Sequence, residues 1–324
     1  MEDVARLAGV SMITVSRAIN TPDKVALATR AKIDAAIAKT GYVPNLIAGS
    51  LASSRSRIIG AIVPTIDNSI FAETVRGLSE TLATAGYQLL LGQTAYAEHA
   101  EEALVAAFLG RRVDGIVLTG ATHSMLTLKR LRSAGVPVVE TWDLPSKPID
   151  MVAGFSNFEA GREIALYLCS KGYRTLGFAG GTDDRTRSRL AGFEAGVKRV
   201  RGIRVLPLSL PAGTSFRGGR EALVRFLEQR PRPDAIFFSN DALAVGALME
   251  CHRLGLRVPQ DIAIAGFADL DIASEVEPRL PTVQVRSRSM GEEAALLLLA
   301  RLAGEPIAQT VRDLGFVVVP RASA

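Results

Sequence analysis

MEDVARLAGVSMITVSR, residues 1–17, is the stretch that decides how the chain begins to fold. Val4 and Leu7 predict the apolar stripe of a first helix, and Gly9 can adopt the positive φ of a tight turn between helices. Ser11 is typical of the N-cap of a second helix. The stretch therefore predicts two short helices joined by a glycine turn, the arrangement of a helix-turn-helix.

The second predicted helix turns Val15 toward the core and most of its other residues outward. The outward residues are Met12, Ile13, Thr14, Ser16 and Arg17. Such apolar, hydroxyl and cationic groups can contact base edges and phosphates in a DNA groove. Helix pairs of this kind also occur in proteins that never bind nucleic acid. A third predicted helix over 28–40, with Ile33 and Ile37 four apart, completes a small core and favours the DNA-reading interpretation.

Positive charge is concentrated at the start of the chain. Residues 1–57 hold eight Lys and Arg against four Asp and Glu, which is +4 of the total net charge of +5. The remaining 267 residues are almost neutral, with 30 basic and 29 acidic side chains. A phosphate backbone is the natural partner of such a basic head.

The 324 residues, 48% of them apolar, are enough for a small head and a two-part body. Cys169 and Cys251 each fall in a predicted helix, which favours buried reduced thiols over a disulfide. No signal-peptide pattern opens the sequence, and no apolar run reaches the roughly 18 residues of a membrane span. We therefore expect a soluble, cytoplasmic protein with no membrane partner.

Residues 44–57, PNLIAGSLASSRSR, separate the head from the body. Small and polar residues surround Leu46, Ile47 and Leu51. A helix this short does not offset the free-energy cost of its own nucleation. The composition favours a flexible linker over a segment that becomes helical only against another surface.

From residue 58 onward, apolar strands alternate with amphipathic helices. The predicted strands are 58–64, 87–93, 115–120 and 136–141 in a first set, and 175–181, 205–209, 235–241 and 262–267 in a second. Strands that are apolar on both faces and separated by helices predict parallel sheets covered on both sides. We expect two similar α/β halves of about five strands each, which meet near 152–157. Segments 282–285 and 313–319 are predicted to cross back between the halves.

Polar and aromatic side chains follow these strands, where parallel sheets bind their ligands. The candidates are Phe71, Gln93, Trp142, Asp143, Asp183, Arg185, Arg189, Asn240 and Asp269. Carboxylates and amides bind hydroxyls, an aromatic ring covers the apolar face of a sugar, and arginines pair with a carboxylate or phosphate. Any one of them alone could be an ordinary polar loop residue. Together they predict a polyhydroxylated ligand that can carry a negative charge.

Three motifs resemble the lactose-repressor family of bacterial transcription regulators. They are DVARLAGVSxxTVSRAIN at 3–20, GYVPNxxAxxL at 41–51 and IGAIVP at 59–64. The body is similar to the gluconate-operon repressors of that family, through NSIFAE at 68–73, GFSNFEA at 154–160, DDRT at 183–186, NDALAVGA at 240–247 and EPRL at 277–280. The resemblance covers essentially the whole chain.

The resemblance implies an α/β fold with a helix-turn-helix head (1–44), a hinge helix and linker (45–57) and a two-lobed body (58–324) like a periplasmic binding protein. Lobe one would comprise 58–154 and 286–312, and lobe two would comprise 155–285 and 313–324. A homodimer would read a pseudo-palindromic operator in double-stranded DNA.

The resemblance also assigns roles in DNA binding. Met12, Ile13 and Arg17 would read the major groove, and the helix would be positioned on phosphates by Ser11, Thr14, Ser16 and Asn20. Tyr42 and Asn45 would add backbone contacts. Ala48 and Leu51 would lie on a hinge helix that folds in the minor groove, where Leu51 wedges into a base step.

For the ligand, Arg189 precedes LAGF where the family places an effector-contacting arginine, and Arg185 lies one helical turn earlier. Two arginines on one face suit a sugar acid, and the pocket would be completed by Phe71, Asp143, Asn240 and Phe216. The chain departs from the family at Ala268, where many members have an Asp that Asp269 would have to replace. It also lacks the residues that usually precede EDVA, including a capping Thr. We therefore expect either a trimmed chain or a misassigned start, and in both cases a weaker first helix and basic arm.

Two other classes of protein share parts of this pattern. An exported sugar-binding protein has the same two-lobed body, but the missing signal peptide and the DNA-reading head argue against it. An enzyme is disfavoured because GxxxxGK[ST], HExxH, GxSxG and nucleotide-type GxGxxG motifs are absent and His99, His123 and His252 are scattered. We therefore expect no catalysis, cofactor or metal, and a repressor released from its operator by a sugar acid. A neutral or phosphorylated sugar remains the alternative effector, and an effector that tightens operator binding remains the alternative sign.

Overall fold

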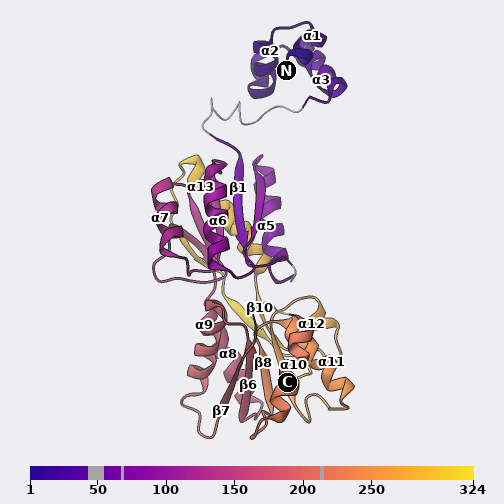
Figure 1. The fold of residues 1–324 in the computed structure, drawn as a ribbon, viewed down its shortest axis with the longest axis vertical. Helices are drawn as coiled ribbons and strands as arrows, with labels where there is room; N and C mark the ends of the chain where they lie inside the picture. Colours follow the sequence, from indigo (N-terminus) through magenta and orange to yellow (C-terminus); the bar gives the residue numbers. More distant parts are fainter. Residues whose placement is uncertain (43–54, 67–68, 212–214) are drawn as a thin grey trace. The chain divides into compact units, whose positions relative to one another are not determined.

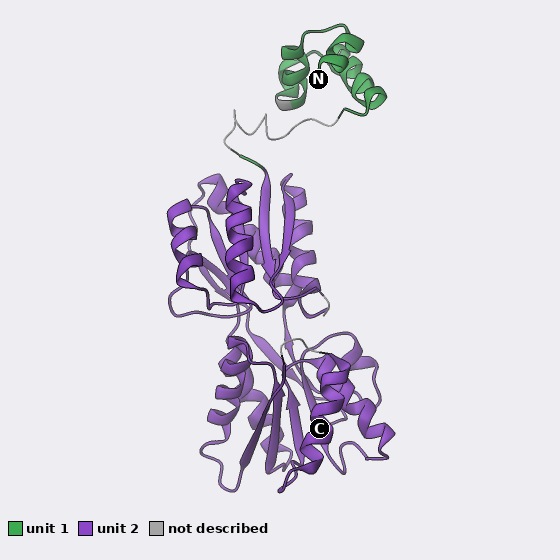
Figure 2. Cartoon of the chain, in the orientation of Figure 1, with its two compact units in different colours: residues 1–56 green, residues 57–324 purple. Residues whose placement is uncertain are grey.

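The computed structural model describes residues 1–42, 55–66, 69–211 and 215–324. Contacts within the chain divide it into two units, residues 1–56 and residues 57–324 (Figure 2). The first unit is the predicted head, and the second contains both halves of the predicted body.

The head consists of α1 (Glu2–Ala8), α2 (Met12–Asn20), a short 3₁₀ turn η1 (Pro22–Lys24) and α3 (Leu27–Thr40). Gly9 ends α1 with φ 66°, a left-handed conformation that an L side chain would strain. Ser11 Oγ accepts a hydrogen bond from the Thr14 amide at 3.2 Å and so caps α2. The helix-turn-helix predicted from residues 1–17 is confirmed.

The head core is small and made largely of short side chains. Its buried residues are Val4, Ala5, Ala8, Val15, Ala18, Ile33 and Ala36, with Ile37 partly buried against them. The prediction that Leu7 faces the core is wrong, because its side chain is 47% exposed. Positions 4, 5 and 8 share one face of α1, and at about 100° per residue position 7 points well away from it.

Lobe one of the body is built on a six-stranded sheet with helices on both faces (Figure 1). Its strands are β1 (Ile58–Val63), β2 (Gln88–Gln93), β3 (Gly115–Thr119), β4 (Val138–Thr141), β5 (Met151–Gly154) and β11 (Val311–Asp313). Its helices are η2 (Ser69–Phe71), α5 (Ala72–Thr84), α6 (Glu98–Gly110), α7 (Met125–Ala134) and α13 (Ser287–Ala303). The strand order is β11-β5-β4-β3-β1-β2, and every pairing is parallel.

Lobe two repeats this plan. Its strands are β6 (Thr175–Gly180), β7 (Arg204–Ser209), β8 (Ala235–Phe238), β9 (Ala263–Ala268), β10 (Thr282–Val285) and β12 (Phe316–Val319). Its helices are α8 (Asn157–Ser170), α9 (Asp184–Val197), α10 (Phe216–Glu228), α11 (Asp241–Arg253) and α12 (Ile272–Glu275). The order is β12-β10-β9-β8-β6-β7, and only the edge strand β12 is antiparallel. The predicted α/β class with parallel sheets is confirmed.

Two details of the sheets differ from the sequence prediction. Each sheet has six strands rather than about five, because β5 falls within the predicted junction and β11 is only three residues long. The chain returns to lobe two after Asp313, which still pairs with Gly154 in the first sheet. A three-residue strand has too few side chains to show an alternating pattern, so its sequence gives little signal.

Three pairs of helices pack at backbone contact through reciprocal glycines. In α8 and α9, a Cβ on Gly161 would lie 1.9 Å from the Arg189 carbonyl oxygen, and one on Gly192 would lie 1.8 Å from that of Phe158. The same arrangement joins α10 to α11 and α5 to α13. Because no larger residue fits these contacts, the helices are fixed relative to one another within a fraction of an ångström.

Both cysteines are free thiols inside helices, as predicted, but only Cys251 in α11 is buried, whereas Cys169 in α8 is half-buried. Burial raises the pKa of the Cys251 thiol to about 12, which keeps it protonated and unreactive. Within the described part of the chain, none of the helices combines the length and the apolar character needed to cross a bilayer.

Lobe one contains a buried ionic cluster between α6 and β4. His123 Nδ1 lies 2.9 Å from Glu101 Oε1, and His123 Nε2 lies 3.6 Å from Glu140 Oε1, too far for a hydrogen bond. The His123 and Glu140 side chains are 1% and 2% exposed. Burial opposes protonation of His123, but the two carboxylates outweigh it and raise its pKa to about 9.

The cluster predicts a pH-dependent stability. A pKa raised from 6.5 to about 9 makes the His123 contribution complete below pH 6.5 and lost as the pH rises through 9. We expect His123→Gln to lower the free energy of unfolding by up to about 3 kcal/mol at pH 6 and by much less at pH 10. Urea denaturation of both proteins across this range measures the difference, and a gap that does not shrink with pH would contradict the charge assignment.

Candidate nucleic-acid interface and ligand cleft

Helix α2 carries its apolar surface on two opposite faces. Val15 and Ala18 are buried in the head core, whereas Met12 is 52% and Ile13 is 65% exposed, and Arg17 is also exposed. No acidic residue lies in the first turn of α2. An exposed apolar pair beside a cation, on a helix whose other face is buried, can enter the major groove of DNA.

Two hydroxyls at the start of α2 are held in place by each other. The Ser11 and Thr14 hydroxyl oxygens lie 2.9 Å apart, and both residues remain at the surface or only partly covered. Ser16 is half-buried, and Tyr42 packs partly buried against the head core. The side chain of Asn20, like residues Asn45, Ala48 and Leu51, lies outside the described part of the chain.

Between the lobes, the strand ends of both sheets line one small cavity of about 30 Å³. It is lined by Ile70, Phe71, Tyr96, Trp142, Asp183, Arg185, Thr186, Arg189, Ser239 and Asn240. Six of these residues were sequence candidates, and they come from both lobes. We call this space the inner cavity.

Arg189 is the most enclosed charge in the inner cavity. Its Nη1 donates to Asn157 Oδ1 at 2.5 Å, and its Nη2 donates to Thr186 Oγ1 at 3.1 Å. The guanidinium lies 4.2 Å from the centroid of the Phe267 ring. Burial lowers its pKa to about 10, although Asp183 and Asp143 oppose the shift, so it remains a cation at neutral pH. Its Nε has no hydrogen-bond partner within the described residues.

Arg185 brings a second buried cation to the same space. Its Nε lies 3.5 Å from Asp183 Oδ1, and its guanidinium lies 5.2 Å from the Phe71 ring centroid. Its buried Nη1 has no hydrogen-bond partner among the residues described. Asp183 caps α9, and its pKa is lowered because Arg185 and Arg189 outweigh the effect of burial. The two arginines therefore leave unused donors in a cavity from which most water is excluded.

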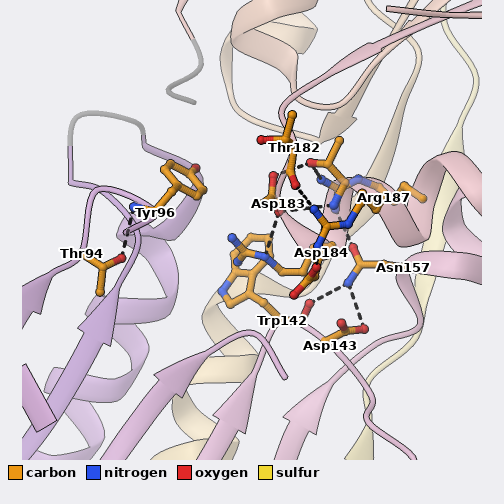
Figure 3. Close-up of polar contacts among 12 residues, drawn as sticks. Thr94, Tyr96, Trp142, Asp143, Asn157, Thr182, Asp183, Asp184 and Arg187 are labelled. Carbon is orange, nitrogen blue, oxygen red and sulfur yellow. Dashed lines mark hydrogen bonds and ion pairs between the residues drawn. The ribbon is translucent and has the colours of Figure 1, made fainter. Parts of the chain in front are cut away.

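An aromatic wall closes one side of the inner cavity. Trp142 has φ 68°, and its Nε1 donates to Thr74 Oγ1 at 3.1 Å. The Trp142 and Phe71 rings meet edge to face with centroids 5.0 Å apart. Asn157 Nδ2 donates to the Trp142 carbonyl at 2.8 Å and to Asp143 Oδ1 at 3.2 Å (Figure 3). Asn157 thus links the lobe-one wall to Arg189 in lobe two.

Four sequence candidates lie outside the inner cavity. Asp143 contacts it only through Asn157. Gln93 accepts a hydrogen bond from the Ile66 amide at 3.2 Å and holds the loop after β1. Phe216 is 49% exposed at the first residue of α10. Asp269 has φ 57° and is held by Arg321 at 2.7 Å and Gln284 at 2.6 Å, beside a different cavity of about 490 Å³.

Sequence reasoning missed two residues that shape the site, Asn157 and Tyr96. Asn157 holds Arg189 together with Thr186, which belongs to the candidate run 183–189, and Tyr96 lines the cavity with Arg185. Thr186 lies within the DDRT motif, and Asn157 follows β5, so both carried a positional signal. Ala95 and Tyr96 have φ 50° and 64°, and nothing in their side chains predicts this left-handed backbone.

The described residues contain no group of three or more His, Cys, Asp or Glu side chains placed to hold a metal ion. The chemistry available in the inner cavity is therefore that of hydrogen-bond donors, two cations and aromatic surface. Such an arrangement offers the hydrogen-bond donors and positive charge that a small anion requires.

Two family models match the chain. The model of bacterial regulatory proteins of the lacI family matches residues 1–45, and the periplasmic binding protein-like domain matches residues 165–324. The HTH-type transcriptional regulator GntR of Escherichia coli K12 is 38% identical over 324 residues, which cover 100% of this chain and 98% of the relative. The regulator IdnR of the same strain is 32% identical, with coverage of 98% and 96%.

Solved structures share the fold over the full length. A LacI-family transcriptional regulator from Silicibacter pomeroyi is 33% identical with a TM-score of 0.92, covering 99% of this chain and 98% of that one. The lac repressor dimer bound to operator and the anti-inducer ONPF is 25% identical with a TM-score of 0.84, covering 99% and 97%. With a helix-turn-helix head, two parallel-sheet lobes and full-length relatives above 30% identity, this chain belongs to the LacI family and is a DNA-binding transcriptional regulator.

Proposed function

We propose that this regulator is a repressor whose dimer leaves its operator when a sugar acid binds between the lobes of the body. The observation that carries the ligand class is the pair of buried arginines with unused donors, Arg185 Nη1 and Arg189 Nε. A buried cation with an unpaired N–H is unfavourable unless an acceptor forms a hydrogen bond with that N–H. A carboxylate can accept hydrogen bonds from two N–H groups at once.

The proposed effector site comprises the residues of the inner cavity, with Asp143 supporting it through Asn157. The other sequence candidates, Gln93, Phe216 and Asp269, lie outside this cavity. Asp183 and Asn240 would accept hydrogen bonds from hydroxyls, and Trp142 and Phe71 would cover the apolar face of the ligand.

On the DNA side, Met12, Ile13 and Arg17 read base edges, and Ser11, Thr14, Ser16, Asn20, Tyr42 and Asn45 position the head on phosphates. Residues 45–57 form the hinge, where Ala48 and Leu51 enter the minor groove. Two subunits bind the two halves of a palindromic operator. The E. coli relatives GntR and IdnR, which match the whole length of the chain, support this assignment.

Effector binding is coupled to DNA binding through the two lobes. The chain passes between them after β5, after β10 and after β11, and the inner cavity is lined by residues of both lobes. A ligand that binds one arrangement of the lobes more tightly shifts the population toward it by that difference in affinity. The effector releases the repressor from DNA only if the lobe arrangement that it binds more tightly is the one that binds DNA poorly.

The head assignment predicts a loss of sequence preference in Arg17→Ala. Removing a base-reading arginine should lower the ratio of operator to random-duplex affinity by about 10- to 100-fold. Fluorescence anisotropy with operator and scrambled duplexes at one salt concentration measures this ratio.

The matched control is Lys32→Ala, which removes one exposed charge from α3 of the same head. Lys32→Ala should weaken binding to both duplexes alike and leave the ratio of the two affinities unchanged, since a phosphate contact carries no sequence information. Equal effects of the two substitutions on the ratio would remove Arg17 from the base-reading set.

The ligand assignment predicts that Arg189→Gln weakens gluconate binding by about 100-fold or more, because a desolvated charge pair is lost. Operator affinity without ligand should stay unchanged. Calorimetry with gluconate and anisotropy with operator measure the two effects separately.

Arg199→Gln is the control, because Arg199 is exposed just beyond the end of α9. It should leave both properties intact, and thermal unfolding verifies that each variant is folded. If gluconate still releases the Arg189→Gln variant from the operator, the ligand assignment is wrong. If gluconate tightens operator binding of the native protein, the proposed sign of the response is wrong.

A further inference from the structure

A second cavity of about 340 Å³ lies next to the inner cavity and shares Tyr96, Asp183 and Arg185 with it. We call it the outer cavity. Its lobe-one side comes from the segments after β2 and β3 and the start of α6, and its lobe-two side comes from 182–187 at the start of α9. Figure 3 shows Thr94 and Tyr96 across from Thr182, Asp183 and Arg187.

The two cavities differ in size, and each has room for a different part of one ligand. At about 10–15 Å³ for each water, the inner cavity has room for roughly two waters, which is close to the size of one carboxylate group. Arg189 lines only the inner cavity, whereas Arg185 lines both. A carboxylate can therefore occupy the inner cavity only if the rest of the molecule extends past Arg185 into the outer one.

Tyr96 lines both cavities from the lobe-one side. Ala95 and Tyr96 both have positive φ, and the Tyr96 amide donates to Thr94 Oγ1 at 3.3 Å. Two successive non-glycine residues in the left-handed region are unfavourable and are typical of functional loops. Burial raises the pKa of the Tyr96 phenol, which therefore stays a neutral hydrogen-bond donor.

The outer cavity is lined by groups that suit hydroxyls. The hydroxyl-bearing residues are Thr94, Tyr96, Thr119, Thr122 and Thr182. His123, whose side chain is 1% exposed, also lines it, and its Nε2 has no hydrogen-bond partner within the described residues. A hydroxylated chain offers both donors and acceptors to such a wall.

The charges of the outer cavity disfavour a second anion. Asp184 pairs with Arg187, Asp183 with Arg185, and Glu101 with His123. Among the described carboxylates of this cavity, Glu98 has no ion-pair partner. It is exposed at the first residue of α6. A ligand phosphate placed here would meet an uncompensated like charge.

We propose, on the basis of the sugar-acid effector above, that the ligand places its carboxylate on Arg185 and Arg189 and its hydroxylated chain in the outer cavity, where Glu98 excludes a terminal phosphate. The effector class is then an unphosphorylated hydroxy acid longer than three carbons. Glu98 acts as a specificity-determining residue.

The test is calorimetric titration of the full-length protein with gluconate, gluconate 6-phosphate and glycerate. The native protein should bind gluconate at least about tenfold more tightly than either of the others, because glycerate leaves the outer cavity empty and the phosphate meets Glu98. Gluconate 6-phosphate binding as tightly as gluconate, or glycerate binding equally well, would overturn the proposed orientation.

Variants of Glu98 test whether its charge or the shape of the outer cavity sets the preference for gluconate over its 6-phosphate. Glu98→Gln should narrow the preference for gluconate over its 6-phosphate by about threefold, and Glu98→Arg should narrow it by about tenfold. Glu228→Gln, an exposed site at the end of α10, is the matched control and should leave the ratio as it is. An unchanged ratio in Glu98→Arg would remove this residue from the specificity assignment.

The outcomes also distinguish this inference from the proposed function. If gluconate binds and requires Arg189 but its 6-phosphate binds equally well, only the orientation fails. If no acid binds and a neutral sugar does so independently of Arg189, the sugar-acid function fails, and the orientation fails with it.

Discussion

The desolvated guanidinium of Arg189 is the constraint on which the ligand cleft depends. A cation this deeply buried is stable only if surrounding groups replace its water, and here they come from different elements. Asn157 begins α8, Thr186 lies one turn earlier on α9, and Phe267 is the penultimate residue of β9. Burial alone would move its pKa further, but the Asp183 and Asp143 carboxylates keep the group charged. One side chain thus fixes the relative positions of three elements.

The same network connects the lobes. Asn157 accepts from Arg189 through its oxygen and donates through its nitrogen to Trp142 and Asp143, which belong to lobe one. In the proposed function, an anion bound to Arg189 would change the charge near Asn157 and so would act on Trp142 and Asp143 in lobe one. Packed cores and helix contacts transmit such shifts as movements of whole elements because they are nearly incompressible.

Backbone contact between helices makes this geometry precise. The glycines at 161 and 192 place the carbonyl of Arg189 against α8, so the arginine and Asn157 are positioned by the same helix crossing. A side chain at either position would separate the helices and shift both partners. Catalysis is not needed to explain such accuracy, because recognition of a small anion also depends on donors placed within a few tenths of an ångström.

The sequence by itself determined the head, the α/β class and the location of the cleft. Gly9, Ser11 and Val15 are local signals, since turn, cap and buried position depend on neighbours a few residues away. Strand ends likewise indicated Phe71, Trp142, Asp183, Arg185, Arg189 and Asn240, because parallel strands bring their carboxyl ends to one edge.

Only the tertiary structure decided the rest. The sequence pattern of α1 suggests that Leu7 is a core residue, but the packing of α1 against α3 leaves it exposed. The three residues of β11 form a strand only because they pair with β5. Phe216, Gln93 and Asp269 have the right chemistry, yet the folding of their loops places them beside other neighbours. Tyr96 lines the cleft from a left-handed backbone conformation, which a tyrosine rarely adopts. Contacts between residues far apart in sequence set these positions, and no local pattern encodes such contacts.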